Sequence, residues 1–169
     1  MSNFYEYIEI VKDIQEKYPE SCVGGSVGLF LHQMNILIPT PSLGDIDIIS
    51  KTEIRLDNSE IDSRKMSSDF DYSMFLNNPS IKIDVKIQEG LEYDIITFNN
   101  FDFKVCKLYI ILKYIYKYAI KYNHFTKYHN KVTIIDGYIK KINNGWVKDE
   151  DISFLKKLKK LTEALVYIT

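Results

Sequence analysis

Apolar and polar positions along the first hundred residues follow patterns that predict a mixed structure of helices and strands. Apolar residues recur at helical spacing from Phe4, and this first helix should end before Pro19. A short apolar run at residues 21–23 favours a strand that leads into a glycine-rich turn. Residues 27–33 then favour a second helix, with Phe30 facing inward.

Period-two alternation predicts the strands that follow. It is clearest at residues 81–87, where apolar side chains should face the core and polar ones should face solvent or a functional site. The same pattern covers residues 45–50 and, more briefly, residues 93–98. Residues 57–80 are rich in Asp, Ser and Asn, so we expect a connection there, with one short element around residues 72–76.

From about Phe103 the apolar residues change to helical spacing. Further helices are expected at residues 132–142 and after a cap at Asp149 or Asp151. The pattern therefore predicts an α+β core over residues 1–100, followed by a helical C-terminal subdomain over residues 101–169 that packs on the core.

Composition narrows the class of protein. The chain has 169 residues, of which 46% are hydrophobic, enough for a packed core. No apolar run has the length of a membrane span and the first residues lack the features of a signal peptide, so we expect no membrane partner and a cytoplasmic location. Two cysteines, Cys22 and Cys106, do not make a disulfide framework, and we interpret them as buried free thiols.

Charge is divided unevenly along the chain. Residues 1–103 carry 8 Lys and Arg against 18 Asp and Glu, whereas residues 104–169 carry 14 against 5. The acidic N-terminal part suits metal binding, and the basic C-terminal part suits phosphate binding. The alternative is that two parts of opposite charge simply attract each other, and the sequence leaves both interpretations open.

Three carboxylates are the strongest candidates for chemistry. Asp45 and Asp47 are two residues apart on a predicted strand and should project from the same face. Asp84 lies on the polar face of its own strand, between Lys82 and Lys86. If the two strands are neighbours, the carboxylates converge and repel one another unless a cation such as Mg²⁺ or Mn²⁺ is present. The alternative for Asp84 is a simple ion pair with one of the two lysines.

A glycine-rich turn, Gly24-Gly25-Ser26, stands between the first strand and the second helix. Glycines let the backbone approach a phosphate closely, and a helix N-terminus offers N–H groups to an anion. The same run also occurs as a plain tight turn, so by itself it does not establish a nucleotide site.

Taken together, the glycine-rich turn, the Asp45-Ile46-Asp47 run and Asp84 on a later strand resemble the nucleotidyltransferase superfamily in kind and order. The similarity is to minimal nucleotidyltransferases of the AbiEii toxin type and covers residues 21–87. It implies a polymerase-beta-like mixed sheet with flanking helices.

The resemblance also implies roles for single residues. Asp45, Asp47 and Asp84 would be the catalytic metal ligands, with Asp84 also activating the acceptor hydroxyl. Gly24, Gly25 and Ser26 would bind the nucleotide, and Lys113 would contact its phosphates. Arginines often precede the paired aspartates in the family, but residues 39–42 here read Pro-Thr-Pro-Ser, so the resemblance does not say which groups hold the triphosphate.

The activity that the resemblance implies is transfer of a nucleoside monophosphate from a nucleoside triphosphate to an acceptor hydroxyl. The acceptor would be an RNA such as tRNA, a protein or a small molecule, and a toxin-like enzyme would have an antitoxin partner. A different class of function is also open: a non-catalytic module that keeps the fold and binds a nucleotide or a protein partner.

A basic stripe on the first predicted C-terminal helix bears on the acceptor. Lys113, Lys117 and Lys121 are spaced by four residues, and tyrosines run beside them. Lysines interleaved with aromatic side chains can bind single-stranded nucleic acid, but a solvated lysine face gives the same pattern.

Overall fold

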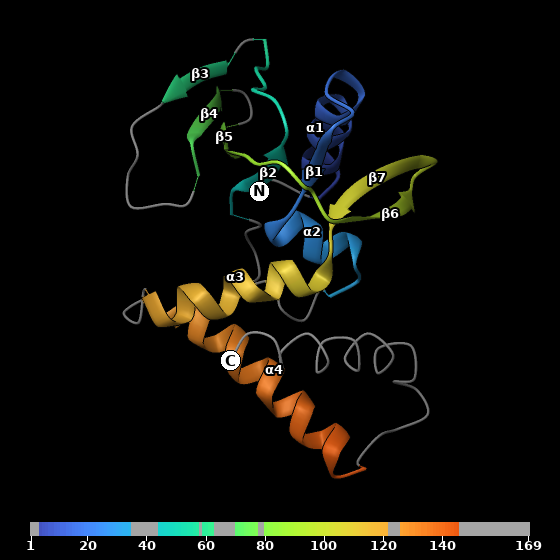
Figure 1. Cartoon of the computed structure of the whole chain (residues 1–169), viewed down its shortest axis with the longest axis vertical. Coiled ribbons are helices and arrows are strands. Elements are labelled where there is room, and N and C mark those ends of the chain that lie inside the picture. The colour runs from blue at the N-terminus through green and yellow to red at the C-terminus, as the bar shows by residue number, and fades with distance from the viewer. Residues whose placement is uncertain are drawn as a thin grey trace. The chain divides into compact units, whose positions relative to one another are not determined.

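The computed structural model describes residues 4–34, 44–57, 59–62, 70–77, 80–121 and 126–145. These residues form an α+β structure with a seven-stranded mixed sheet and four helices (Figure 1). The chain divides into two compact units, Met1–Lys107 and Leu108–Thr169. The α+β class expected from the sequence is therefore confirmed.

The sheet belongs to the first unit, and its strands lie in the order β3-β4-β5-β2-β1-β7-β6. β2 is parallel to β5 and β1 is parallel to β7, whereas the other neighbouring strands are antiparallel. The strands span β1 Ser21–Val23, β2 Ile46–Ser50, β3 Ser59–Asp62, β4 Tyr72–Asn77, β5 Ser80–Ile87, β6 Tyr93–Phe98 and β7 Phe101–Cys106.

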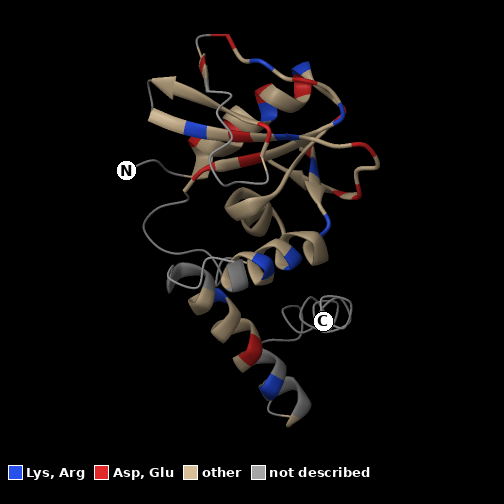
Figure 2. Ribbon diagram, turned by 60° about the vertical axis from the view of Figure 1, so that its left-hand side comes forward, with Lys and Arg blue, Asp and Glu red and all other residues tan. Residues whose placement is uncertain are grey.

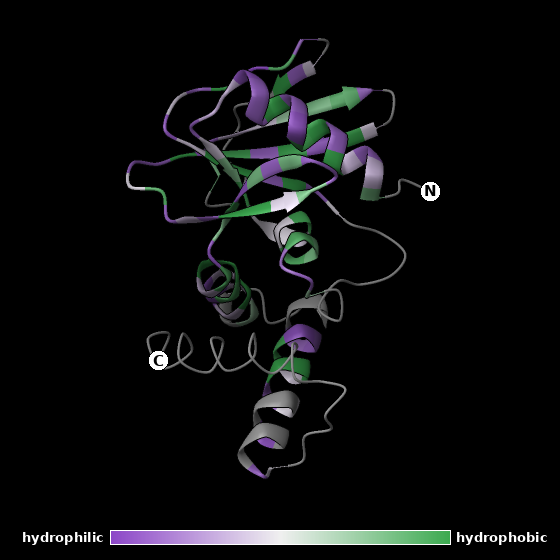
Figure 3. Cartoon of the chain, turned by 90° about the vertical axis from the view of Figure 1, so that its right-hand side faces the viewer, coloured by the Kyte–Doolittle hydropathy of each residue, from purple (hydrophilic) through white to green (hydrophobic). Residues whose placement is uncertain are grey.

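Two helices pack on the central strands of this sheet and on each other. α1 spans Phe4–Lys17, and its apolar residues at helical spacing, such as Ile8 and Val11, are buried as predicted. Figure 3 shows the corresponding alternation of hydrophobic and hydrophilic segments along the chain. α2 spans Gly25–Leu31, so it begins and ends two residues earlier than predicted. Phe30, expected to face inward, is half-buried and stacks on Phe4 with ring centroids 4.2 Å apart.

The strands with alternating sequence patterns are confirmed. In β5 the side chains of Ile81, Ile83 and Val85 are buried, because they occupy one face of the strand, and the polar residues between them occupy the other. β2 and β6 also lie where the alternation predicts them, and β4 matches the short element expected in the polar connection. β3, a four-residue edge strand, was not predicted.

Residues 101–106 form a strand, so the helix expected from about Phe103 is wrong for this segment. Asn99 and Asn100 have φ values of 48° and 62°. Two positive φ values in succession suit the tight turn of a β-hairpin, and here the turn joins β6 to β7. β7 completes the sheet beside β1, and the boundary expected at residue 100 therefore lies inside this hairpin.

The second unit contains α3, Leu108–Lys121, and α4, Thr126–Asn143. Leu112 of α3 and Ile135 of α4 are buried, and Tyr116 donates a hydrogen bond to Asp136 Oδ1 at 3.0 Å. The last predicted helix, with its caps Asp149 and Asp151, lies outside the described residues. Within the residues that are described, no helix is long and apolar enough to cross a membrane.

Candidate functional site

The acidic face of the sheet is formed where β2 and β5 run side by side. The register of this parallel pair places Asp47 directly opposite Asp84. Residues opposite each other on neighbouring strands point to the same face, so the two carboxylates share one side of the sheet. Ile46 and Ile48 are fully buried on the other side. The two strands are therefore neighbours, as the sequence analysis required for the carboxylates to converge.

Lys82 lies among the aspartates on this face. It stands two residues before Asp84 on β5, and Asp45 immediately precedes β2, whose first residue Ile46 pairs with Ile83. Its Nζ is 3.6 Å from Asp84 Oδ1 and 3.8 Å from Asp45 Oδ2. The ion pair that the sequence left open as an alternative for Asp84 is thus present, and it extends to Asp45.

Ser73 is a further partner of Asp84 that the sequence did not single out. It lies on β4, opposite Asp84, and its hydroxyl donates a hydrogen bond of 2.6 Å to Asp84 Oδ1. Asp84 is only 9% exposed, so the hydroxyl and the ammonium of Lys82 together compensate a largely buried carboxylate. The alternation of Tyr72 and Met74 with Ser73 would have placed this serine on a polar face.

The glycine-rich turn lies against Asp47. Gly25 has a φ of +56°, a conformation that side-chain-bearing residues rarely adopt. A Cβ at Gly25 would lie 3.0 Å from Asp47 Cγ and closer still to Asp47 Oδ2. Gly25 is therefore required by the approach of a carboxylate, and the sequence had suggested the approach of a phosphate instead.

The other two residues of the turn are less constrained. Gly24 has an extended conformation, and its backbone N–H donates to the carbonyl oxygen of Asp47 at 2.9 Å. A Cβ there would make an ordinary contact, 3.5 Å from Cys106 Sγ. Ser26 is half-buried in the first turn of α2, which is only seven residues long.

Buried cysteine and histidine side chains lie next to the glycine-rich turn. The Sγ atoms of Cys22 and Cys106 are 3.3 Å apart, and both thiols are free and buried, as interpreted from the sequence. The hydrogen bond with Cys22 and burial raise the pKa of the Cys106 thiol far above its ordinary value, so that thiol stays neutral. His32 Nε2 lies 2.8 Å from the carbonyl oxygen of Cys106, and this buried histidine directly follows the last residue of α2.

The three carboxylates are chemically suited to a hard divalent cation, but their side chains are not arranged to coordinate one. Among the described residues, which include all three aspartates, no three His, Cys, Asp or Glu side chains lie close enough together to hold an ion as they stand. The ammonium of Lys82 already stands as a cation between Asp45 and Asp84. Carboxylate oxygens are the ligands that Mg²⁺ and Mn²⁺ prefer. Asp45, Asp47 and Asp84 are therefore the candidate ligands for such an ion.

Lys113 belongs to the second unit, where it is exposed on α3. The lysines of this helix appear as blue bands in Figure 2. Lys117 Nζ lies 5.9 Å from the centre of the Tyr114 ring, and the Tyr114 and Tyr118 rings are 6.0 Å apart. The lysines and tyrosines of the stripe therefore do interleave on α3, whereas the side chain of Lys121 lies outside the described residues.

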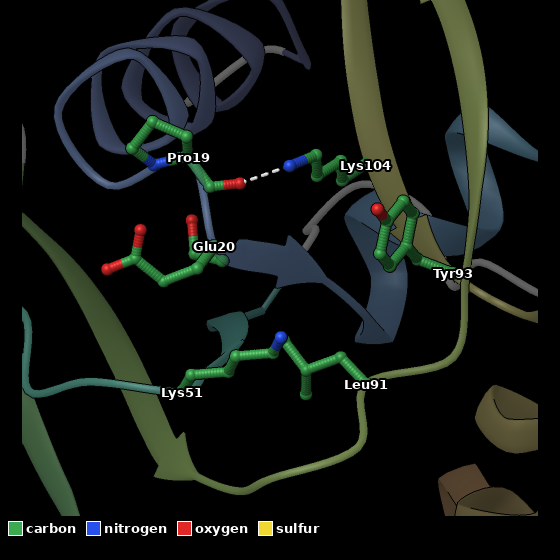
Figure 4. A pocket seen from close by; sticks show the side chains of 7 residues that line it. Pro19, Glu20, Lys51, Leu91, Tyr93 and Lys104 are labelled. Atoms are coloured by element: carbon green, nitrogen blue, oxygen red, sulfur yellow. Dashed lines mark hydrogen bonds between the residues drawn. The ribbon is translucent and has the colours of Figure 1, made fainter.

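A cavity of about 240 Å³ lies beside Ser21, the first residue of β1 (Figure 4). It is bordered by Glu20, Lys51, Tyr93 and Lys104. Lys104 donates a hydrogen bond to the Pro19 carbonyl oxygen, and its Nζ lies 5.3 Å from the centre of the Tyr93 ring. None of the residues predicted from the sequence to form the site lines this cavity.

Comparisons with protein-family models, with curated proteins and with solved structures find no significant match to this chain. The support for a function therefore comes from the geometry of the acidic face and from the sequence pattern.

Proposed function

We propose that this protein is a metal-dependent nucleotidyltransferase that moves a nucleoside monophosphate from a nucleoside triphosphate to an acceptor hydroxyl. One observation carries the proposal: Asp47 and Asp84 stand opposite each other on parallel neighbouring strands, with the glycine-rich turn packed against Asp47. This arrangement joins three segments that are far apart in the sequence and that carry the family-like motifs.

In the proposed reaction, the acceptor oxygen attacks the α-phosphorus and the bond to the bridging oxygen of the pyrophosphate breaks. A bound divalent ion would supply positive charge that offsets the charge developing on the phosphoryl oxygens. Asp84 would take the proton of the acceptor hydroxyl. The Ser73 hydroxyl, which donates to Asp84 Oδ1, would limit the orientations open to this carboxylate.

The identity of the acceptor is part of the proposal. We favour RNA, such as tRNA, over a protein or a small molecule, because α3 exposes Lys113 and Lys117 beside Tyr114. An antitoxin partner would inhibit a toxin-like activity of this kind.

A non-catalytic nucleotide-binding module is the second candidate. The observation that favours it is Lys82, whose ammonium bridges Asp45 and Asp84 and so keeps the carboxylates from forming a finished metal site. Binding of a triphosphate without any transfer would identify this function.

The test is a transfer assay with each of the four α-³²P-labelled triphosphates, with Mg²⁺ or Mn²⁺, and with total tRNA or a protein extract as acceptor. The parent protein should label an acceptor, and Asp47→Asn should reduce labelling at least a hundredfold. Asp94→Asn is a matched control, because Asp94 is an exposed carboxylate on β6 that pairs with Lys107 at 3.9 Å. Full labelling by Asp47→Asn, or no triphosphate binding by the parent, would overturn the proposal.

A further inference from the structure

We propose that Lys82 is a built-in counter-cation of the acidic face, which divalent metal displaces and which then holds the phosphates of the bound triphosphate. This inference rests on the proposed function and assigns a role to a residue outside the family-like motifs. It also names a group that could stand in for the missing arginines, because residues 39–42 carry no basic side chain.

In the state without metal, the Lys82 ammonium lies close to two carboxylates. Asp45 and Asp84 carry like charges on one face, and the Lys82 ammonium lies within 4 Å of a carboxylate oxygen of each. Opposite charges at this distance offset the repulsion between the two acids. Lys82 therefore stabilises the acidic face when no metal is bound.

A divalent metal competes with the Lys82 ammonium for the same carboxylates. A magnesium ion needs carboxylate oxygens at about 2.0–2.1 Å and cannot share the space between Asp45 and Asp84 with an ammonium group. The two cations also repel each other. Because the Lys82 side chain is 41% exposed and on a flexible stem, it can leave this position by rotating into solvent.

A displaced Lys82 ammonium stays close to the acidic face. Lys82 remains anchored on β5 on the same face as Asp84, two residues away, so a displaced ammonium stays next to any triphosphate that the metal holds. Three other lysines of the first unit have partners elsewhere: Lys12 pairs with Glu16, Lys107 pairs with Asp94, and Lys104 donates to the Pro19 carbonyl oxygen. An ammonium group binds phosphate oxygens well as a point charge.

The experiment compares Lys82→Met with Lys107→Met in the full chain. The control is closely matched: each variant removes one ammonium that lies just under 4 Å from a carboxylate, and the two lysine side chains are 41% and 45% exposed. Mn²⁺ binding without nucleotide is measured by electron paramagnetic resonance. Binding of a non-hydrolysable triphosphate analogue with Mg²⁺ is measured by calorimetry.

The inference expects two changes of opposite sign in Lys82→Met. Mn²⁺ alone should bind on the order of tenfold more tightly, because a competing cation is gone, and the analogue should bind on the order of tenfold more weakly. Lys107→Met should behave like the parent in both measurements. Lys82→Arg, which keeps the charge, should bind Mn²⁺ as weakly as the parent, and it provides a second test if Lys82→Met folds poorly.

Equal Mn²⁺ affinity in the parent and in Lys82→Met would overturn the inference while leaving the proposed function standing. Weaker binding of both Mn²⁺ and the analogue in Lys82→Met would also overturn it, because a purely structural role moves both affinities in the same direction. If neither the parent nor any variant binds Mn²⁺ or the analogue, the proposed function itself is overturned, and the inference with it.

Discussion

Replacing Gly25 with alanine tests how the glycine-rich turn and the acidic face depend on each other. The new Cβ would lie 3.0 Å from Asp47 Cγ and 3.3 Å from Asp47 Cβ, inside normal contact distance. The carboxylate of Asp47 has to move by roughly 1 Å to restore ordinary contacts. The backbone at Gly25 also has a φ of +56°, which disfavours alanine independently of any clash.

The two effects differ in size and can be separated. The left-handed backbone conformation costs alanine about 1–2 kcal/mol relative to glycine. Crowding a packed site adds about 1–3 kcal/mol. Gly25→Ala should therefore lower the free energy of unfolding by about 2–5 kcal/mol. A displacement of about 1 Å at a metal ligand should also reduce transfer activity on the order of a hundredfold.

Gly90→Ala is the matched control, because Gly90 has a φ of +67° and open space around its missing side chain. It should lose only the backbone contribution of about 1–2 kcal/mol and keep full activity. Urea unfolding and the transfer assay measure both variants. If Gly25→Ala loses no more stability than Gly90→Ala and transfers nucleotide at the parent rate, the assigned contact between the turn and Asp47 is wrong.

Two further predictions concern buried groups of the first unit. Tyr72 donates a hydrogen bond to the Ile54 carbonyl oxygen at 2.6 Å and accepts one from the Ile54 N–H at 2.8 Å, so Tyr72→Phe should cost about 1–3 kcal/mol of unfolding free energy in urea titrations. Burial raises the pKa of the Tyr72 hydroxyl above its ordinary value of 10.0. The stabilisation that this hydroxyl provides is therefore fully present below about pH 10 and is lost as the pH rises above that value. Above about pH 10 the free energy of unfolding of the parent should fall more steeply with pH than that of Tyr72→Phe. Cys22 and Cys106 are each 1% exposed, so Ellman's reagent should label neither thiol in the folded protein and both after unfolding. Rapid labelling of the folded protein would contradict the burial of these two thiols next to the glycine-rich turn.

The sequence predicted the acidic face well, because strands with one buried side have a strict period. The alternation in β5 predicted which side Asp84 occupies, and the alternation in β2 did the same for Asp47, whereas Asp45 lies one residue before that strand. What alternation could not supply was the pairing of strands, which depends on contacts between distant segments. The partnership of Ser73 with Asp84 is of this kind.

The misjudged segments have physical reasons. Phe103 and Val105 fit both a helix and a strand over so short a span, and the decisive signal was the pair Asn99 and Asn100, whose positive φ values turn the chain back on itself. The sequence singled out Gly25 for the approach of a phosphate, whereas the structure places Asp47, which is distant in the sequence, against it. Such a contact is visible only in the fold.

The central claim is that Asp45, Asp47 and Asp84 together hold a divalent metal with a nucleotide. The most direct measurement is anomalous X-ray diffraction from crystals grown with Mn²⁺ and a non-hydrolysable triphosphate analogue. The claim predicts a manganese peak at about 2.0–2.2 Å from oxygens of Asp45, Asp47 and Asp84, with the Lys82 ammonium moved away from both Asp45 and Asp84. Crystals that contain the analogue but show no manganese at these carboxylates, with Lys82 still paired to Asp45 and Asp84, would contradict it.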